Sequence, residues 1–205
     1  MFQSVVLLKR QALLTEHLVK RGSSVLQDFQ NAIAANVQTI EHVLDVMNYA
    51  FALVDSLVKY QKIARSVPRL NQKSQECRAL IFSIGELTEI RNQHQHINRS
   101  VLNNFTGPLL GAVSWVSDNV TYTASFNDIG RDRSVPGIIF DTVENRYLHK
   151  FCYIFGEKYH DLEKAINGLR NFEAYIAKTF SVSIGEVPFR ADQHYLAYSA
   201  KISLL

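Results

Sequence analysis

The residues best suited to chemistry lie in one short segment, where Arg91 and Asn92 are followed, after three residues, by His96. Histidine titrates near neutral pH, so an imidazole can take a proton from a ribose 2′-hydroxyl or give one to a departing 5′-oxygen. Arginine stays cationic, and its planar fork can contact two oxygens of a phosphate on which negative charge is building. These residue types could therefore cleave an RNA phosphodiester without a metal ion.

Several neighbours of this pair could support it. Asn92 lies four residues before His96, so on a regular helix its amide sits over the imidazole and could orient it through a hydrogen bond. Glu89, Asn92, His96 and Arg99 would then share one polar stripe. We expect Glu89 to support the site and Arg99 to contact RNA.

His94 belongs to a different side of the same helix. It falls in the apolar stripe between Ile90 and Ile97. This position favours a hydrogen-bonded core or interface histidine over a second member of the site.

Helix geometry raises a difficulty for a site made of Arg91 and His96 alone. Five residues at about 100° each place the two side chains about 140° apart on a straight helix. Either the helix is distorted between Ile90 and His94, or a second subunit brings its own Arg and His to a shared cleft.

The segment from Glu86 to His96 resembles the signature of the HEPN family of helical ribonucleases and toxins. That signature is an Arg, four to six residues and then a His, often with an Asn directly after the Arg. Requiring that Asn lowers the number of matches expected by chance in this chain from about 0.4 to about 0.03. The resemblance covers the motif and the surrounding helical order.

The resemblance implies a metal-independent endoribonuclease, acting as a toxin or defence effector. HEPN ribonucleases build a composite site from two motifs, and this chain holds one Arg-x4-His, so a homodimer is expected. RNA is then the substrate, no cofactor is needed, and an antitoxin or other regulatory protein is a further expected partner. The alternative is a non-catalytic helical dimerisation or binding module of the same fold, since fold does not dictate function.

A basic run precedes the motif. Lys59, Lys62 and Arg65 follow one another at steps of three residues, and further basic residues follow at Arg69, Lys73 and Arg78. Such a stripe could hold RNA phosphates beside the motif. A solvated helix end is the alternative, and an Arg and a His on a polar helix face are also often only solvated or salt-bridged.

Apolar periodicity predicts a mainly α-helical bundle whose first part is a long helical hairpin. We expect a first helix from about Gln3 to Arg21, a break at Gly22-Ser23, and then one long helix, or two helices in line, from Val25 to Ile63. Ser24 and Gln27 could form a capping box where the long helix begins.

The long helix should end near Ser66, because Pro68 restricts the residue before it. A second amphipathic stripe then runs from Leu80 to Phe105 and carries the motif, until Thr106, Gly107 and Pro108 stop it.

The composition changes between Ala112 and Phe140, which is rich in β-branched and aromatic residues. Because the polar run from Asn127 to Asp132 interrupts it once, we expect an inserted β-hairpin. Helical spacing then predicts a last helix from Thr142 to Phe180. The expected domain is residues 1–180, with a C-terminal tail at 181–205.

Composition and other motifs exclude several classes of protein. Apolar residues make up 47% of the 205 and the net charge is only +3, which is typical of a globular domain. No apolar run is long enough for a membrane span, and no secretory signal is visible, so we expect a cytoplasmic protein. Cys77 and Cys152 have no metal-binding spacing and should be reduced thiols. Glu157 and His160 have a di-iron spacing, but no second copy follows.

Overall fold

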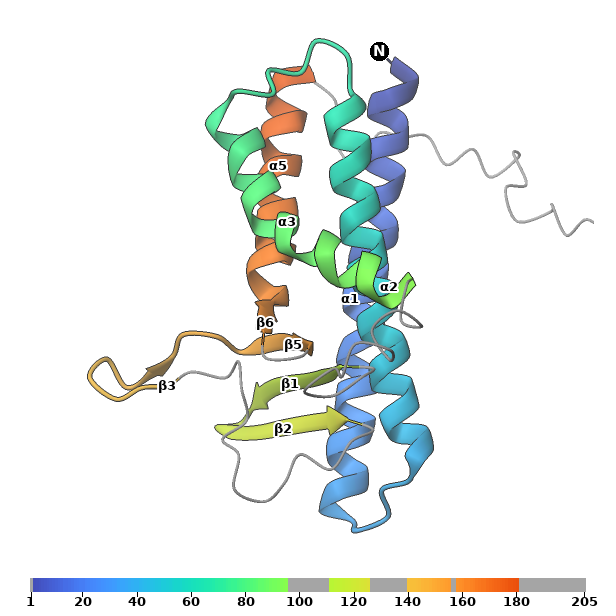
Figure 1. Cartoon of the computed structure of the whole chain (residues 1–205), viewed down its shortest axis with the longest axis vertical. Helices are drawn as coiled ribbons and strands as arrows, with labels where there is room; N and C mark the ends of the chain where they lie inside the picture. The colour runs from blue at the N-terminus through green and yellow to red at the C-terminus, as the bar shows by residue number, and fades with distance from the viewer. Residues whose placement is uncertain (1, 96–110, 126–139, 156–157, 181–205) are drawn as a thin grey trace, which may run out of the picture.

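Two long helices form an antiparallel hairpin that extends from one end of the molecule to the other (Figure 1). The first, α1, spans Phe2–Ala34, and the second, α2, spans Ile40–Ser66. The computed structural model describes residues 2–95, 111–125, 140–155 and 158–180. The predicted helix from Val25 to Ile63, whether single or in two parts in line, is wrong, because α1 ends at Ala34 and the chain folds back before α2 begins at Ile40. The end of α2 at Ser66 is as Pro68 indicates.

The predicted break at Gly22-Ser23 is wrong, because both residues lie inside α1. Gly22 is buried, and a Cβ at this position would overlap the ring of Tyr49 on α2. The glycine therefore permits close packing of the two helices instead of ending the first one. Ser24 is also inside α1, so the predicted capping box does not form there.

The chain turns between α1 and α2 at residues 35–39. Asn36 has a φ of 54°, and the N–H of Val37 donates to the carbonyl of Ala32 over 2.9 Å. This left-handed residue and its long backward hydrogen bond close the helix in the manner of a Schellman motif. An asparagine tolerates this conformation, so it is the local signal that the periodicity analysis overlooked.

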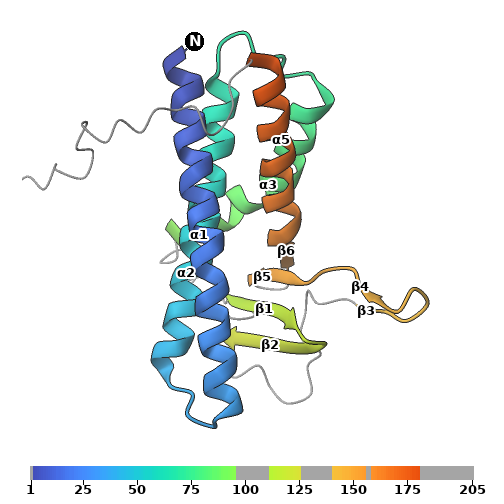
Figure 2. The same cartoon turned by 180° about the vertical axis from the view of Figure 1, so that it is seen from behind.

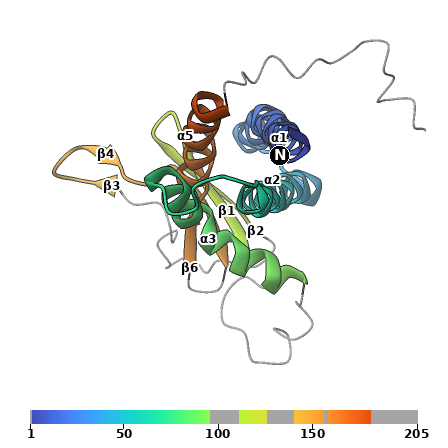
Figure 3. The same cartoon turned by 90° about the horizontal axis from the view of Figure 1, so that it is seen from above.

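Two more helices pack beside one half of the hairpin, as the front, rear and top views show (Figures 1, 2 and 3). These are α3, Gln75–Gln95, and α5, Leu162–Phe180. The predicted stripe of α3 is confirmed where its side chains are described, since Leu80, Ile84, Leu87 and Ile90 are all buried. One hydrophobic core joins residues of α1, α2, α3 and α5 with residues of the strands.

A four-stranded antiparallel sheet lies across the other half of the hairpin (Figure 1). Its order is β2-β1-β5-β6, with β1 at Ala112–Ser117, β2 at Val120–Ser125, β5 at Phe151–Phe155 and β6 at Lys158–Asp161. A separate pair, β3 at Phe140–Asp141 and β4 at Arg146–Tyr147, projects away from the body (Figure 3).

The inserted hairpin is confirmed, but its turn is not where the polar run predicted it. β1 and β2 pair through the two-residue turn Asp118-Asn119, whose φ angles of 49° and 62° match a type I′ turn. Both strands therefore precede the run from Asn127 to Asp132, which lies outside the described residues.

The predicted helix from Thr142 to Phe180 is wrong over its first half. Residues 151–155 and 158–161 are strands, and α5 begins only at Leu162. Phe151, Ile154 and Phe155 fit a helical stripe by spacing, but the segment Phe-Cys-Tyr-Ile-Phe is also β-prone, and pairing with β1 decides the outcome. Cys77 and Cys152 are buried free thiols, as expected, and burial raises the pKa of Cys152 to about 12. The predicted tail lies outside the described residues.

Candidate functional site

Arg91, the predicted phosphate-binding residue, is held against α2 by an ion pair. Its Nε donates to Oδ1 of Asp55 over 2.6 Å, and Nζ of Lys59 lies 2.7 Å from Oδ2 of the same carboxylate. Arg91 continues the buried stripe of Ile84 and Leu87, so it faces α2, and its side chain is only 20% exposed. The shared carboxylate therefore orients the guanidinium.

The surroundings of Asp55 keep this carboxylate ionised. Partial burial alone would raise its pKa, but hydrogen bonds from Lys59 and Arg91, together with their charges, outweigh that and lower it. Asp55 therefore holds two cations, Lys59 and Arg91, through one carboxylate.

The other predicted members of the motif lie on several sides of α3 or outside the described residues. Asn92 is exposed, and Glu89 pairs with Lys158 of β6, with 3.2 Å between Nζ and Oε1. His94 lies in the last turn of α3. His96 and Arg99 lie outside the described residues, so the predicted angle between Arg91 and His96 stays a prediction.

The predicted basic stripe runs along the exposed side of α2. Lys59, Lys62 and Arg65 are all exposed, and the ten steps from Asp55 to Arg65 span about 15 Å of helix. Three more exposed cations continue the stripe through the α2–α3 connection into α3, namely Arg69, Lys73 and Arg78. Arg91 therefore sits at one end of a line of positive charge.

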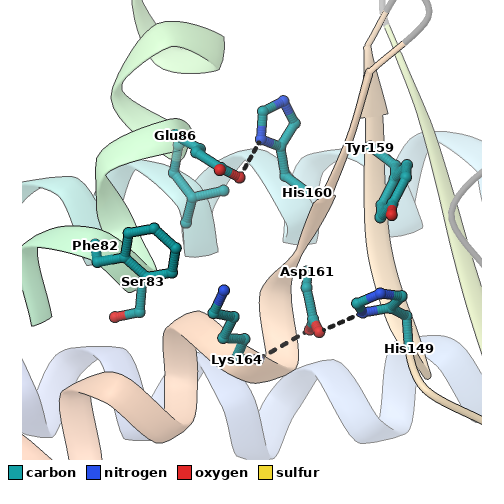
Figure 4. A pocket seen from close by; sticks show the side chains of 9 residues that line it. Phe82, Ser83, Glu86, His149, Tyr159, His160, Asp161 and Lys164 are labelled. Atoms are coloured by element: carbon teal, nitrogen blue, oxygen red, sulfur yellow. Dashed lines mark hydrogen bonds and ion pairs between the residues drawn. The ribbon is translucent and has the colours of Figure 1, made fainter. Parts of the chain in front are cut away.

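A second group of titratable side chains, which the sequence analysis missed, surrounds a cavity of about 250 Å³ between α3, β6 and the start of α5 (Figure 4). It is lined by Phe82, Ser83, Glu86, Leu87, His149, Tyr159, His160, Asp161 and Lys164. Phe82, Glu86 and Glu89 follow each other at steps of four and three on α3, so this side of the helix faces the sheet edge.

His149 and Asp161 form a close pair on one side of the cavity. Nδ1 of His149 lies 2.8 Å from Oδ2 of Asp161, while Oδ1 of Asp161 accepts the backbone N–H of Lys164 over 2.9 Å. Asp161 is thus both the N-cap of α5 and the residue that orients the imidazole. When the carboxylate accepts from Nδ1, Nε2 is the ring atom that can exchange a proton with a ligand.

His160 is the buried polar residue of the cavity. Its side chain is 6% exposed, and Nδ1 lies 3.5 Å from Oε2 of Glu86, a carboxylate that is 67% exposed. Burial lowers the pKa of His160, although the charge of Glu86 acts in the opposite direction. Nδ1 is buried and has no hydrogen-bond partner in the described structure.

The sequence did not reveal this cavity, because the apolar spacing of residues 142–161 suggested a helix. A strand places Tyr159 and Asp161 on one face and His160 on the other, whereas the assumed helix hid that alternation. Asp161 was the available signal, since an aspartate before Leu162 is typical of a helix N-cap.

In the described parts of the chain, no three His, Cys, Asp or Glu side chains are grouped so that they could hold a metal ion. No helix there is both long and apolar enough to cross a membrane.

Scans against protein-family models, curated proteins and solved structures each returned no match. The HEPN assignment therefore stays a prediction based on the motif.

Proposed function

We propose that the chain is a HEPN-like, metal-independent endoribonuclease in which Arg91 binds the scissile phosphate and His96 moves the proton. The observation that carries the proposal is the ion pair of Arg91 with Asp55 at the end of the basic stripe on α2. A guanidinium whose Nε is held at 2.6 Å has a defined plane before substrate arrives. Preorganised donors of this kind stabilise charge that develops in a transition state.

The proposed step is a transesterification within the RNA. An imidazole takes the proton of the 2′-hydroxyl, the 2′-oxygen forms a bond to phosphorus, and the bond from phosphorus to the 5′-oxygen breaks. The leaving 5′-oxygen receives a proton from an imidazolium. The products are a 2′,3′-cyclic phosphate and a 5′-hydroxyl, and Asn92 would orient the imidazole of His96.

A homodimer is part of this proposal, because the chain has one Arg-x4-His and the resemblance implies a site built from two. The interface should bury at least about 1,000 Å² in total. A role as a toxin or defence effector, restrained by an antitoxin or regulatory protein, belongs to the same proposal. Sedimentation of the full chain at micromolar concentration tests the dimer, and a concentration-independent monomer would contradict a composite site.

The decisive experiment is single-turnover cleavage of single-stranded RNA by the full chain. His96→Ala should lower the rate at least about 10²-fold, because a positioned acid or base typically contributes 10² to 10⁴. His17→Ala, which removes an exposed histidine of α1, is the matched control and should not change the rate. EDTA should have no effect, and mass spectrometry should find the cyclic phosphate.

The second candidate function is a non-catalytic dimerisation or binding module. The same ion pair favours it, since Asp55 already compensates Arg91 and ties α3 to α2, which is a structural role. Wild-type protein that binds RNA but never cleaves it would favour this candidate. Undiminished cleavage by His96→Ala would contradict the role proposed for His96.

A further inference from the structure

Two aromatic rings border the cavity between α3 and β6. Phe82 projects from α3 and Tyr159 from β6, and they lie on opposite sides of the cavity in Figure 4. Their exposed fractions are 67% and 39%, so both rings have surface available to a ligand. Exposed aromatic rings at a cavity are the surfaces on which single-stranded nucleic acid bases stack.

The polar groups of the cavity combine one carboxylate with one ammonium. Glu86 offers two acceptor oxygens, and Lys164 offers donors, with Nζ held 4.3 Å from the centre of the Phe82 ring. Beside Glu86, the buried Nδ1 of His160 has no hydrogen-bond partner within the described residues. Oε2 of Glu86 lies 3.5 Å from this nitrogen, so His160 is placed to position the carboxylate.

This pattern matches guanine better than the other bases. Guanine presents two adjacent N–H donors, which a carboxylate can accept together, and a neighbouring pair of acceptors, O6 and N7, that lysine commonly contacts. Adenine would turn an acceptor towards Glu86, and uracil offers a single donor. A volume of about 250 Å³ is below the usual range for drug-sized ligands and suits one base.

We propose that this cavity recognises a guanine base of single-stranded RNA, an inference that rests on the RNA substrate of the proposed function. Glu86 accepts from the base, Lys164 donates to it, Tyr159 and Phe82 contact its faces, and His160 positions Glu86. Glu86 lies five residues before Arg91, about 7.5 Å along the axis of α3, on a different side of the helix. One strand passing around α3 can therefore reach both.

Calorimetric titration of the full chain with GMP and with AMP tests the inference, and binding of the labelled pentamers UUGUU and UUAUU repeats it on RNA. Wild type should prefer guanine at least about tenfold in both assays. Glu86→Gln should remove the preference, because an amide donates where the carboxylate accepted. Tyr159→Ala should weaken the binding of GMP and of AMP to the same extent, since stacking does not distinguish the edges of the bases.

Glu76→Gln is the matched control, because Glu76 is another exposed glutamate of α3 that lies outside the cavity lining. It should keep the preference. Equal affinity for guanine and adenine in both assays, no binding in either, or an unchanged preference in Glu86→Gln would overturn the inference.

These outcomes are separable from those of the proposed function, because mononucleotide binding needs no cleavage. Selective binding of GMP by a protein that cuts no RNA would leave the guanine pocket standing and remove the ribonuclease. Cleavage of RNA by a protein that binds GMP and AMP with equal affinity would remove the guanine pocket and leave the ribonuclease standing.

Discussion

Helix α3 makes two different kinds of polar contact on two of its sides. Towards α2, Arg91 meets Asp55 at 2.6 Å with a side chain that is 20% exposed. Towards β6, Glu86 and Glu89 meet His160 and Lys158 at 3.5 and 3.2 Å, and the two carboxylates are 67% and 51% exposed. The first contact is close and partly shielded from water, whereas the second side is open.

The difference has a physical reason and a functional consequence. On the α2 side the polar residue continues an apolar stripe, so helix packing determines where the guanidinium lies. On the β6 side both carboxylates are more than half exposed, and ion pairs of exposed groups contribute at most about 1 kcal/mol. The α2 side is suited to holding one rigid cation, and the β6 side to adapting to a ligand.

The largest expected effect concerns Arg91, on the side of α3 that faces α2. Arg91→Lys keeps the charge but loses the planar fork, so single-turnover RNA cleavage should fall at least about tenfold. Asn92→Ala removes only an orienting hydrogen bond worth about 1 kcal/mol, so its loss should be smaller, about fivefold. Arg146→Lys, on the projecting β3–β4 pair, is the matched control and should leave cleavage unchanged.

Circular dichroism and the melting temperature of these three variants must stay near those of wild type, so that the rates report chemistry. Cleavage by Arg91→Lys at the wild-type rate would show that orientation of the guanidinium is unimportant, and the contrast between the two sides would lose its functional meaning.

The next effect concerns packing beneath the cavity. A Cβ at Gly168 of α5 would overlap the hydroxyl of Ser83 and lie 2.9 Å from its Cβ, whereas a Cβ at Gly85 of α3 meets nothing within 4 Å. Gly168→Ala should therefore lower the free energy of unfolding by about 1 to 3 kcal/mol. Gly85→Ala should raise it by about 0.5 to 1 kcal/mol, as is usual inside a helix.

Urea unfolding followed by circular dichroism measures both glycine variants. Equal effects of the same sign would mean that α3 and α5 are not in close contact at Ser83, which lines the cavity.

The smallest expected effect is a pH dependence of folding stability, caused by His160 on the side of α3 that faces β6. Burial lowers the pKa of His160 below its ordinary 6.5, so the folded protein favours the neutral ring. As the pH falls below 6.5, the unfolded chain takes up this proton first, and stability is lost. His160→Gln should therefore lose less stability than wild type between pH 7 and pH 5.5, with the other titrating groups common to both.

On the side of α3 that faces α2, stability should depend on pH in a different range. Because the pKa of Asp55 is lowered from 3.8, its contribution is present above that value and is lost only as the pH falls below it. Urea midpoints measured from pH 7 to pH 3 separate the contributions of His160 and Asp55. A His160→Gln protein whose midpoint falls in parallel with that of wild type would contradict the burial argument.

Much of the helical architecture could be predicted, and the misses have specific causes. The stripes of α2 and α3 follow from spacing alone, because an amphipathic helix buries every third or fourth residue. The turn after α1 was misplaced because Gly22 is a packing glycine, which only the approach of Tyr49 reveals. Residues 151–155 fit both periods, and their pairing with β1 decided between them.

The sequence by itself determined that Arg91 and Asn92 lie on an amphipathic helix and that basic residues line the helix before it. These properties depend on positions a few residues apart, which helix geometry relates directly. Only the tertiary structure decided that Arg91 meets Asp55, 36 positions away, and that Glu89 meets Lys158, 69 positions away. It also decided that His149, His160 and Glu86 border one cavity. Such neighbours depend on how separate elements pack, and no local period specifies that.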